Sequence, residues 1–159
     1  MHLREGEKIL KVYRHHPTPF VYKIFKLVLL FVPFYLLLIL AGGNLSGRGY
    51  FWSYFLLSVL LIIVLTYSAL VYWLDKLVIT NQRIIYINWK YLTVKHESDL
   101  ELGKIEDIQT QENGFWAHFR IFDYGTLNLA TASSYTALVF TEAPDPEHIR
   151  QFINHIMQQ

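Results

Sequence analysis

The chain has 159 residues and a formal net charge of +1, with 53% hydrophobic and 17% charged residues and no cysteine. It is more apolar than an ordinary soluble domain, and the missing cysteines exclude disulfides and thiolate metal sites. Residues 1–26 carry six Lys/Arg against two Glu, whereas residues 75–159 carry seven Lys/Arg against eleven Asp/Glu. A basic N-terminal segment, residues 1–19, therefore precedes an acidic C-terminal part.

Two apolar runs follow the basic segment. Residues 20–41 contain only the charges of Lys23 and Lys26, and residues 50–73 contain none. At 1.5 Å per residue, about 22 residues span roughly 33 Å, which crosses a bilayer core if both lysines extend toward the headgroups. The sequence predicts two transmembrane helices over these runs, joined by a short external loop, residues 42–49. The second run begins and ends with aromatic residues of the kind that anchor helices at membrane interfaces: Tyr50, Trp52, Tyr72 and Trp73.

The distribution of basic residues predicts the orientation of the two helices. Six Lys/Arg precede or open the first run, whereas the connector carries only Arg48. Because cytoplasmic flanks are enriched in Lys and Arg, the N-terminus is expected in the cytoplasm, and two spans return the C-terminus to the same side. A cleaved signal sequence is not favoured, since the first run starts some 20 residues into the chain and a second span follows it.

Residues 74–159 form the aqueous part of the chain, where short β-type runs alternate with turn residues. This pattern predicts a small antiparallel sheet structure. Asp145 and Pro146 suit the N-cap and first position of a closing amphipathic helix that reaches Met157. The six predicted strands are Lys76–Thr80, Arg83–Asn88, Leu92–Glu97, Ile105–Gln111, Gly125–Thr131 and Thr136–Thr141.

Four segments carry a resemblance to a known family: LDKLVITNQRIIYIN, LELGKIEDIQ, GFWAHFRIFDYGTLNLATA and APDPEHIRQFI. In this order they resemble the bacterial pleckstrin-homology-like (PH) domain over nearly all of residues 74–157. A helix hairpin directly before this domain, preceded by GEKILKVYRHH, is similar to membrane-anchored PH-domain proteins of the YdbS-like kind. The resemblance implies an α+β protein in the bacterial cytoplasmic (inner) membrane, with a two-helix transmembrane hairpin followed by a PH-like antiparallel β-barrel and a capping C-terminal α-helix.

The resemblance also implies two roughly orthogonal sheets and, in most members, seven strands. Only six strands are predicted after the membrane segment. Either one strand is missed, or residues 8–14 dock as an extra strand, a hypothesis prompted by the β-compatible run from Ile9 to Tyr13. The resemblance implies no catalytic residue.

Basic residues are the candidates for lipid contact. The first turn of the domain offers Arg83, with Lys76 and Lys90 expected nearby, which is little charge for a phosphate pocket. An acidic domain is also repelled by an anionic leaflet, so Arg83 is expected to pair with a carboxylate or to solvate the turn. The candidate lipid-facing residues are therefore Arg14, Lys23, Lys26 and Arg83, with nonspecific contacts expected for the N-terminal ones.

Aromatic residues are concentrated between residues 115 and 124. Helical spacing places three phenylalanines on one face of a short helix, with a tryptophan beside them. They either fill the open end of the barrel or remain exposed as an interface for a neighbouring subunit or the membrane surface. The candidate interaction surface consists of Phe115, Trp116, Phe119 and Phe122.

Nothing in the sequence matches a catalytic or cofactor motif: G-x-S-x-G, H-E-x-x-H and a phosphate-binding glycine loop are all missing. Glu106 and Asp107 are neighbours on a predicted strand and should point to opposite faces. The adjacent His15 and His16 have no carboxylate at ligand spacing, so we interpret them as interfacial residues. We expect no enzyme, no cofactor, no metal site and no nucleic-acid partner.

The sequence leaves three hypotheses for function. The leading one is a membrane-anchored PH-domain protein that acts as a protein-interaction or scaffold module at the cytoplasmic face and also associates with itself. The first alternative is a module that senses lipid headgroups. The second is a subunit of a channel or transporter, although the spans offer few polar side chains for a pore.

Overall fold

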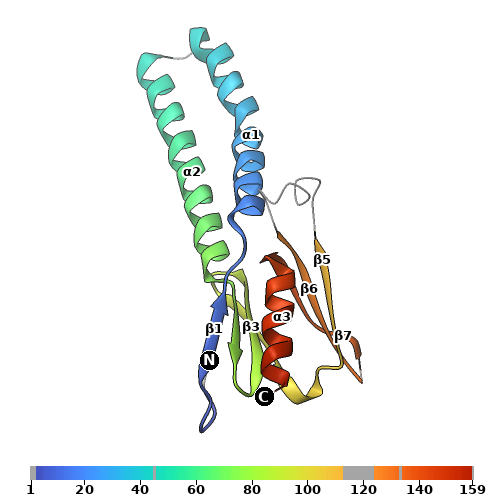
Figure 1. Ribbon diagram of the computed structural model, residues 1–159. Coiled ribbons are helices and arrows are strands. Elements are labelled where there is room, and N and C mark those ends of the chain that lie inside the picture. The colour runs from blue at the N-terminus through green and yellow to red at the C-terminus, as the bar shows by residue number, and fades with distance from the viewer. Residues whose placement is uncertain (1–2, 45, 113–123, 133, 159) are drawn as a thin grey trace. The chain divides into compact units, whose positions relative to one another are not determined.

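The computed structural model describes residues 3–44, 46–112, 124–132 and 134–158. It divides into two compact units (Figure 1). The helix-pair unit comprises residues 19–70, and the sheet unit comprises residues 1–18 together with residues 71–159. The sheet unit is thus assembled from segments that lie before and after the helix pair in the sequence.

Helix α1 spans Pro17–Ala41 and helix α2 spans Gly47–Leu74, with a short 3-10 turn, η1, at Gly42–Asn44. Both helices are long and apolar enough to cross a membrane. Among the described residues of the two helices, only Phe31 is buried. A helix that is apolar around its whole circumference needs a nonaqueous environment. The apolar composition of α1 and α2 and the exposure of their side chains therefore both indicate helices of this kind.

Polar contacts inside the helix-pair unit join α1 to α2. The hydroxyls of Tyr35 and Ser58 lie 3.0 Å apart, and the ring of Tyr35 lies 5.1 Å from that of Tyr54. A hydroxyl in an apolar environment needs a partner, so this pair satisfies two polar groups at once.

Sheet A is antiparallel and contains β1 (Ile9–Tyr13), β2 (Lys76–Thr80), β3 (Arg83–Tyr91) and β4 (Val94–Glu101) in the order β1-β2-β3-β4. The hypothesis of an extra N-terminal strand is confirmed, because β1 pairs with β2 and brings Tyr13 opposite Leu77. The helix pair is therefore an insertion between two hydrogen-bonded neighbouring strands.

Sheet B contains β5 (Asp107–Glu112), β6 (Tyr124–Thr131) and β7 (Ser134–Pro144) in that order, and a 3-10 turn, η2 (Leu102–Lys104), links it to sheet A. Helix α3 (Pro146–Met157) closes the chain and packs against β5 and β6. Its N-cap is the predicted one: Asp145 Oδ1 accepts a hydrogen bond from the backbone N–H of His148 at 2.9 Å.

The hydrophobic core lies where the two sheets and α3 meet. Its fully buried side chains come from β2, β3, β6, β7 and α3, and include Leu77, Ile84, Leu127, Phe140, Ile149 and Ile153. The predicted PH-like fold is confirmed, with the difference that, among the described strands, the two sheets keep separate ladders and do not close into a barrel. Close approach at Gly125 is part of this packing, because an added Cβ would lie 2.2 Å from the carbonyl oxygen of Gln111.

The predicted strand boundaries agree best with the observed ones where residues typical of turns separate the strands. Strand β2 has the predicted bounds. The strand predicted over Leu92–Glu97 corresponds to β4, and its predicted start at Leu92 is wrong. Leu92 and Thr93 form the turn of the β3–β4 hairpin, and β4 extends through polar residues to Glu101. Local β propensity favoured the run from Leu92, whereas pairing with β3 decided the register.

Candidate functional site

The turn between β2 and β3 lies at one end of sheet A, which we call the distal end. The side chain of Glu7 is completely buried there. Arg83 Nε donates to Glu7 Oε1 at 2.9 Å and its Nη2 donates to Oε2 at 3.1 Å, while Nη1 donates to Asp99 Oδ2 at 2.9 Å. This two-point contact fixes the N-terminal segment on the turn.

Further donors complete the environment of the Glu7 carboxylate. The backbone N–H of Arg4 donates to Oε2 at 2.7 Å, and the Thr80 hydroxyl donates to Oε1 at 2.9 Å. Hydrogen bonds from Arg83 and then from Arg4 lower the pKa of Glu7 to about 2, because they favour the charged carboxylate. The hydrogen bonds that Arg83 donates to Glu7 and then to Asp99 raise the pKa of Arg83 above its ordinary value, so this ion pair is charged at neutral pH.

The expected grouping of cations around this turn is wrong. Lys76 pairs with Ile87, at the opposite end of β2 and β3, and Lys90 lies further still from the turn. Arg83 is opposite Glu101 and is bound by carboxylates on two sides. A phosphate at this place would have to compete with fixed negative charges that already neutralise the guanidinium.

The other end of sheet A, the junction end, is where β1 passes into α1 and α2 passes into β2. Asp75 lies between α2 and β2 and connects three segments. Its Oδ1 accepts a hydrogen bond from the backbone N–H of Trp89 at 2.6 Å, and its Oδ2 lies 3.5 Å from His15 Nε2. This carboxylate therefore links the end of α2, the hairpin and the connection between β1 and α1.

The interpretation of both histidines as interfacial is wrong for His15. Its side chain is 4% exposed, and its ring stacks on Phe140 with centroids 4.9 Å apart. His16 donates its backbone N–H to the carbonyl of Glu142 at 2.8 Å and accepts a hydrogen bond from the Tyr72 hydroxyl through its own carbonyl. The residues before α1 are thus part of the packed sheet unit.

The candidate interface anchors differ in exposure. Trp52 and Trp73 are 53% and 69% exposed, whereas Tyr50 and Tyr72 are half-buried. The guanidinium of Arg14 lies 5.8 Å from the centre of the Trp73 ring. An arginine over an exposed tryptophan is an arrangement suited to a lipid headgroup layer.

The remaining basic candidates lie on α1. Lys23 and Lys26 are both exposed, and Lys26 Nζ lies 4.4 Å from the centre of the Tyr22 ring. The candidate interaction surface consists of Phe115, Trp116, Phe119 and Phe122. These residues lie outside the described part of the chain, so their arrangement stays a prediction.

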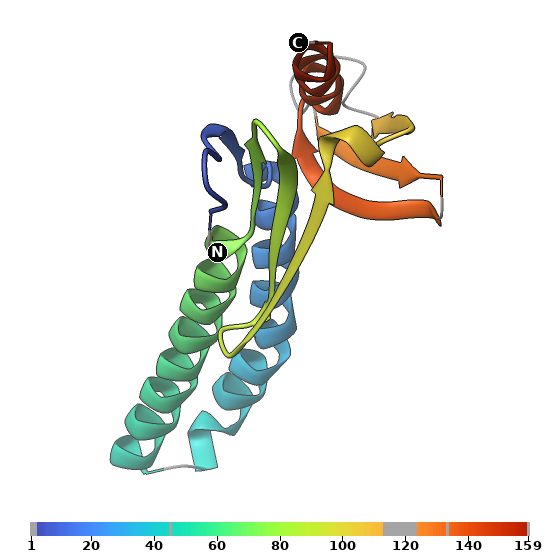
Figure 2. The same cartoon turned by 90° about the horizontal axis from the view of Figure 1, so that it is seen from below.

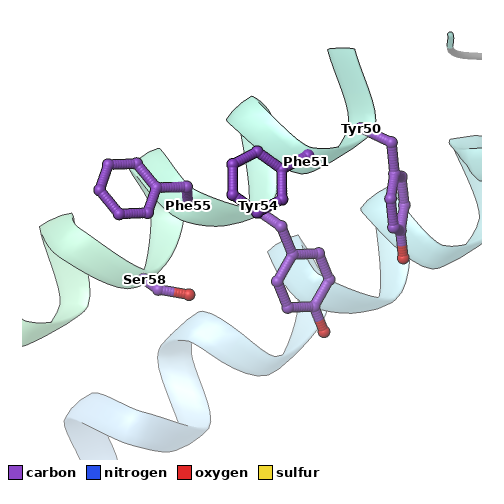
Figure 3. Close-up of a pocket in the computed structure, with 5 residues that line it drawn as sticks. All are labelled: Tyr50, Phe51, Tyr54, Phe55 and Ser58. Carbon is purple, nitrogen blue, oxygen red and sulfur yellow. The ribbon is translucent and has the colours of Figure 1, made fainter. Parts of the chain in front are cut away.

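A groove of about 410 Å³ lies on the helix-pair unit, lined by Tyr50, Phe51, Tyr54, Phe55 and Ser58 (Figure 3). Figure 3 shows the two tyrosines directed toward the neighbouring helix. The rings of Phe51 and Phe55 stack with centroids 6.3 Å apart. This nearly apolar lining suits an acyl chain or another helix. In the described part of the chain, no group of three or more His, Asp or Glu is arranged to hold a metal ion.

Sequence reasoning missed Glu7, His15 and Asp75, which organise the two ends of sheet A. Each is a single polar residue with distant partners, so no spacing motif marks it. One available signal was the position of Asp75, a charged residue directly after a long apolar run. A second was the aromatic and basic stretch from Trp89 to Lys95, which the predicted boundaries divide between a turn, residues 89–91, and the strand that begins at Leu92.

Comparison with known proteins identifies relatives for most of the chain. A family model described as "Bacterial PH domain" matches residues 23–157. One similar solved structure is a DUF1696 family protein with a pleckstrin-homology domain from Shewanella loihica PV-4, at 21% identity and TM-score 0.41, covering 52% of this chain and 70% of that chain. Another is a pleckstrin homology domain from Shewanella amazonensis SB2B, at 20% identity and TM-score 0.41, covering 52% and 66%. No curated protein was found to match.

Proposed function

Because this chain belongs to the bacterial PH domain family, we propose that it is a non-enzymatic protein anchored in the bacterial inner membrane by α1 and α2. Both termini lie in the cytoplasm. The sheet unit acts as an interaction scaffold at the cytoplasmic face and binds further copies of the same chain.

The observation that carries this proposal is the insertion of the helix pair between β1 and β2. Residues 14–16 separate β1 from α1, and Asp75 alone separates α2 from β2. Strands β1 and β2 are hydrogen-bonded to each other, so both connections leave one ladder. With links this short, a membrane that holds the helices also holds the sheet unit at its surface, without a flexible tether.

Exposure and charge support the membrane location and the orientation. Side chains such as Leu40 and Phe51 on the two helices are 79% and 63% exposed, a costly arrangement in water. Lys and Arg are enriched before and at the start of α1, whereas the connector between the helices carries only Arg48. The positive-inside rule then places the sheet unit in the cytoplasm.

The charge arrangement of the sheet unit favours protein contacts over headgroup sensing. The guanidinium of Arg83 is bound by Glu7 and Asp99. Strand β4 presents Asp99 and Glu101 with side chains 47% and 40% exposed. An acidic outer strand repels anionic lipid but can bind a basic protein surface.

The two outer strands of sheet A make copies of the chain suitable partners for each other. Strand β1 and the residue before it carry Lys11 and Lys8, beside the side chains of Ile9 and Val12, which are 48% and 45% exposed. Strand β4 is acidic and runs antiparallel to β1, because the four strands alternate in direction. Strand β1 of one copy can therefore continue the antiparallel order beside β4 of the next.

Cysteine crosslinking tests this assembly, since the natural chain contains no cysteine. Copies carrying Val12→Cys are mixed in membranes with copies carrying Ser98→Cys, and a short bismaleimide is added. We expect mixed dimers that decrease at high salt. The matched control pairs Val12→Cys with Asn154→Cys, an exposed position on α3. Mixed dimers no more abundant than in this control would contradict association through these strands.

The headgroup alternative has a separate readout. The intact protein in zwitterionic nanodiscs is titrated with glycerol 3-phosphate while the Nε–H NMR signal of Arg83 is followed. We expect no saturable shift, because carboxylates already bind this guanidinium. A saturable, salt-sensitive shift would favour headgroup sensing instead.

A further inference from the structure

The β3–β4 hairpin extends beyond the end of its neighbour β2. Strand β2 begins at Lys76, which pairs with Ile87, but β3 continues to Tyr91 before the turn at Leu92 and Thr93. Four further residues at about 3.3 Å each give an extension of roughly 13 Å. We call residues 89–95 the hairpin tip; they lie at the far end of the long two-stranded projection in Figure 2.

The hairpin tip lies at the junction end of sheet A, where the chain enters and leaves the helices. Strand β2 runs away from the end of α2, so β3, its antiparallel partner, returns toward it. The hydrogen bond from the Trp89 backbone to Asp75 fixes the base of the tip beside the residue that follows α2. Everything beyond Trp89 therefore extends past the point at which α2 ends.

The side chains of the tip are unusual for a turn in water. Tyr91, Leu92 and Val94 are 51%, 37% and 39% exposed, and Lys90 is also exposed. Trp89 packs on the outer face of sheet A at the base of the tip. Aromatic and aliphatic side chains next to lysine are typical of segments that lie in a headgroup layer, where the rings and stems are buried and the ammonium groups remain hydrated.

The turn at the distal end of the same strands provides the contrast. Asn81 and Gln82 form that turn, and their side chains donate hydrogen bonds to the carbonyls of Gly6 and Glu5. The polar turn is thus hydrogen-bonded to the protein's own N-terminal segment, whereas the apolar turn at the junction end exposes its large side chains.

We propose that the hairpin tip inserts into the interfacial layer of the bilayer that α1 and α2 span, an inference that rests on the proposed membrane anchoring. The interfacial region is roughly 5–8 Å thick on each side of the hydrocarbon core. An extension of roughly 13 Å past the start of β2 is long enough to reach it. The tip is then a third attachment point besides the two helix connections, and it limits rotation of the sheet unit on the membrane.

Spin labels on the intact protein in nanodiscs of phosphatidylcholine and phosphatidylglycerol test this insertion. A nitroxide on Thr93→Cys, in the turn, reports on the tip without removing its apolar side chains. One on Ser98→Cys reports on β4, further from the junction. A third label on Ile62→Cys reports on α2. We expect the Thr93 and Ile62 labels to collide more with oxygen than with a polar nickel complex, and the Ser98 label to show the reverse.

The combined change Tyr91→Ser, Leu92→Ser and Val94→Ser should move the Thr93 label to the accessibility of the Ser98 label. The matched control, Val139→Ser, removes another exposed apolar side chain, on β7, and should leave the Thr93 label unchanged.

The outcomes separate the two proposals. If the Ile62 label lies in the bilayer but the Thr93 label is as accessible to nickel as the Ser98 label, tip insertion is overturned while membrane anchoring stands. If the Thr93 label is shielded from both reagents, a protein surface covers the tip and insertion is also overturned. An Ile62 label accessible to nickel would overturn the membrane anchoring itself.

Discussion

The two ends of sheet A are built from the same strands but differ in how charged and apolar side chains are placed. At the distal end, Glu7 and Arg83 neutralise each other and hold the N-terminal segment on a polar turn. At the junction end, His15 lies among the rings of Tyr72, Tyr86 and Phe140 and contacts Asp75, and the neighbouring hairpin tip exposes apolar side chains. Charge is thus satisfied within the protein at the distal end, and apolar surface remains at the junction end.

The largest effect is expected from removing the aromatic support of the junction end. Phe140 is fully buried, and the centroid of its ring lies 4.9 Å from that of His15 and 5.4 Å from that of Tyr86. Phe140→Ala leaves a cavity and should cost about 3–5 kcal/mol of unfolding free energy. Denaturant unfolding of the intact protein in detergent measures this loss. Val139→Ala, at the exposed neighbouring position, should cost much less, and equal losses would contradict the assigned packing.

Removing the buried carboxylate at the distal end should give the next largest effect. Glu7→Gln removes a carboxylate that binds the partly buried Arg83 at two points and should lower the unfolding temperature by several degrees. Glu5→Gln changes an exposed glutamate on the same segment and serves as the control. If Arg83→Met is added to Glu7→Gln, part of the loss should be recovered, because no unpaired charge then remains. Additive losses would show that the two residues act separately.

Acid should weaken the distal end, where the side chain of Glu7 is buried. The pKa of Glu7 is about 2, below the ordinary value of 4.5, so its stabilisation is complete above pH 4.5 and is lost as the pH falls toward 2. Unfolding temperatures measured between pH 5 and pH 2 should therefore decrease more steeply for the natural protein than for Glu7→Gln. Parallel curves would mean that Glu7 does not contribute to acid unfolding.

The smallest effect is expected at Asp75. Burial, followed by the negative charges of Asp75 and Glu142, raises the pKa of Tyr86 to about 12. Asp75→Asn keeps an oxygen acceptor for the Trp89 backbone but removes a charge, so the pKa of Tyr86 should decrease while staying above 10. Alkaline titration of ¹³Cζ-labelled tyrosine by NMR measures it. An unchanged pKa of Tyr86 would place the Asp75 charge too far away to matter.

Much of the fold was predictable because several local signals are strong. The long apolar runs predicted both helices, and the Asp145–Pro146 pair predicted the start of α3. The PH-like fold also followed from the resemblance of whole segments. The register of β4 was not predictable in this way, because Thr93 and Val94 have high β propensity, yet Thr93 forms the turn together with Leu92. Pairing with β3 outweighs that local preference.

The candidate sites were less predictable than the fold. Arg83 was expected to find a carboxylate partner, but its partner Glu7 lies 76 positions away, across the helix pair. His15 was interpreted as an interfacial residue, since sequence alone does not show that Phe140 covers it. Contacts between residues far apart in the chain leave no periodic signal, so only the folded arrangement reveals them.

The sequence by itself determined which segments are apolar enough to span a bilayer, where α3 begins, and which family the chain belongs to, because these properties depend on residues close together in the chain. The tertiary structure alone decided that β1 joins β2 across the helix pair and that the two ends of sheet A carry opposite chemistry. Strand pairing acts between residues that are distant in sequence, and it determines which charges meet and which apolar side chains remain exposed.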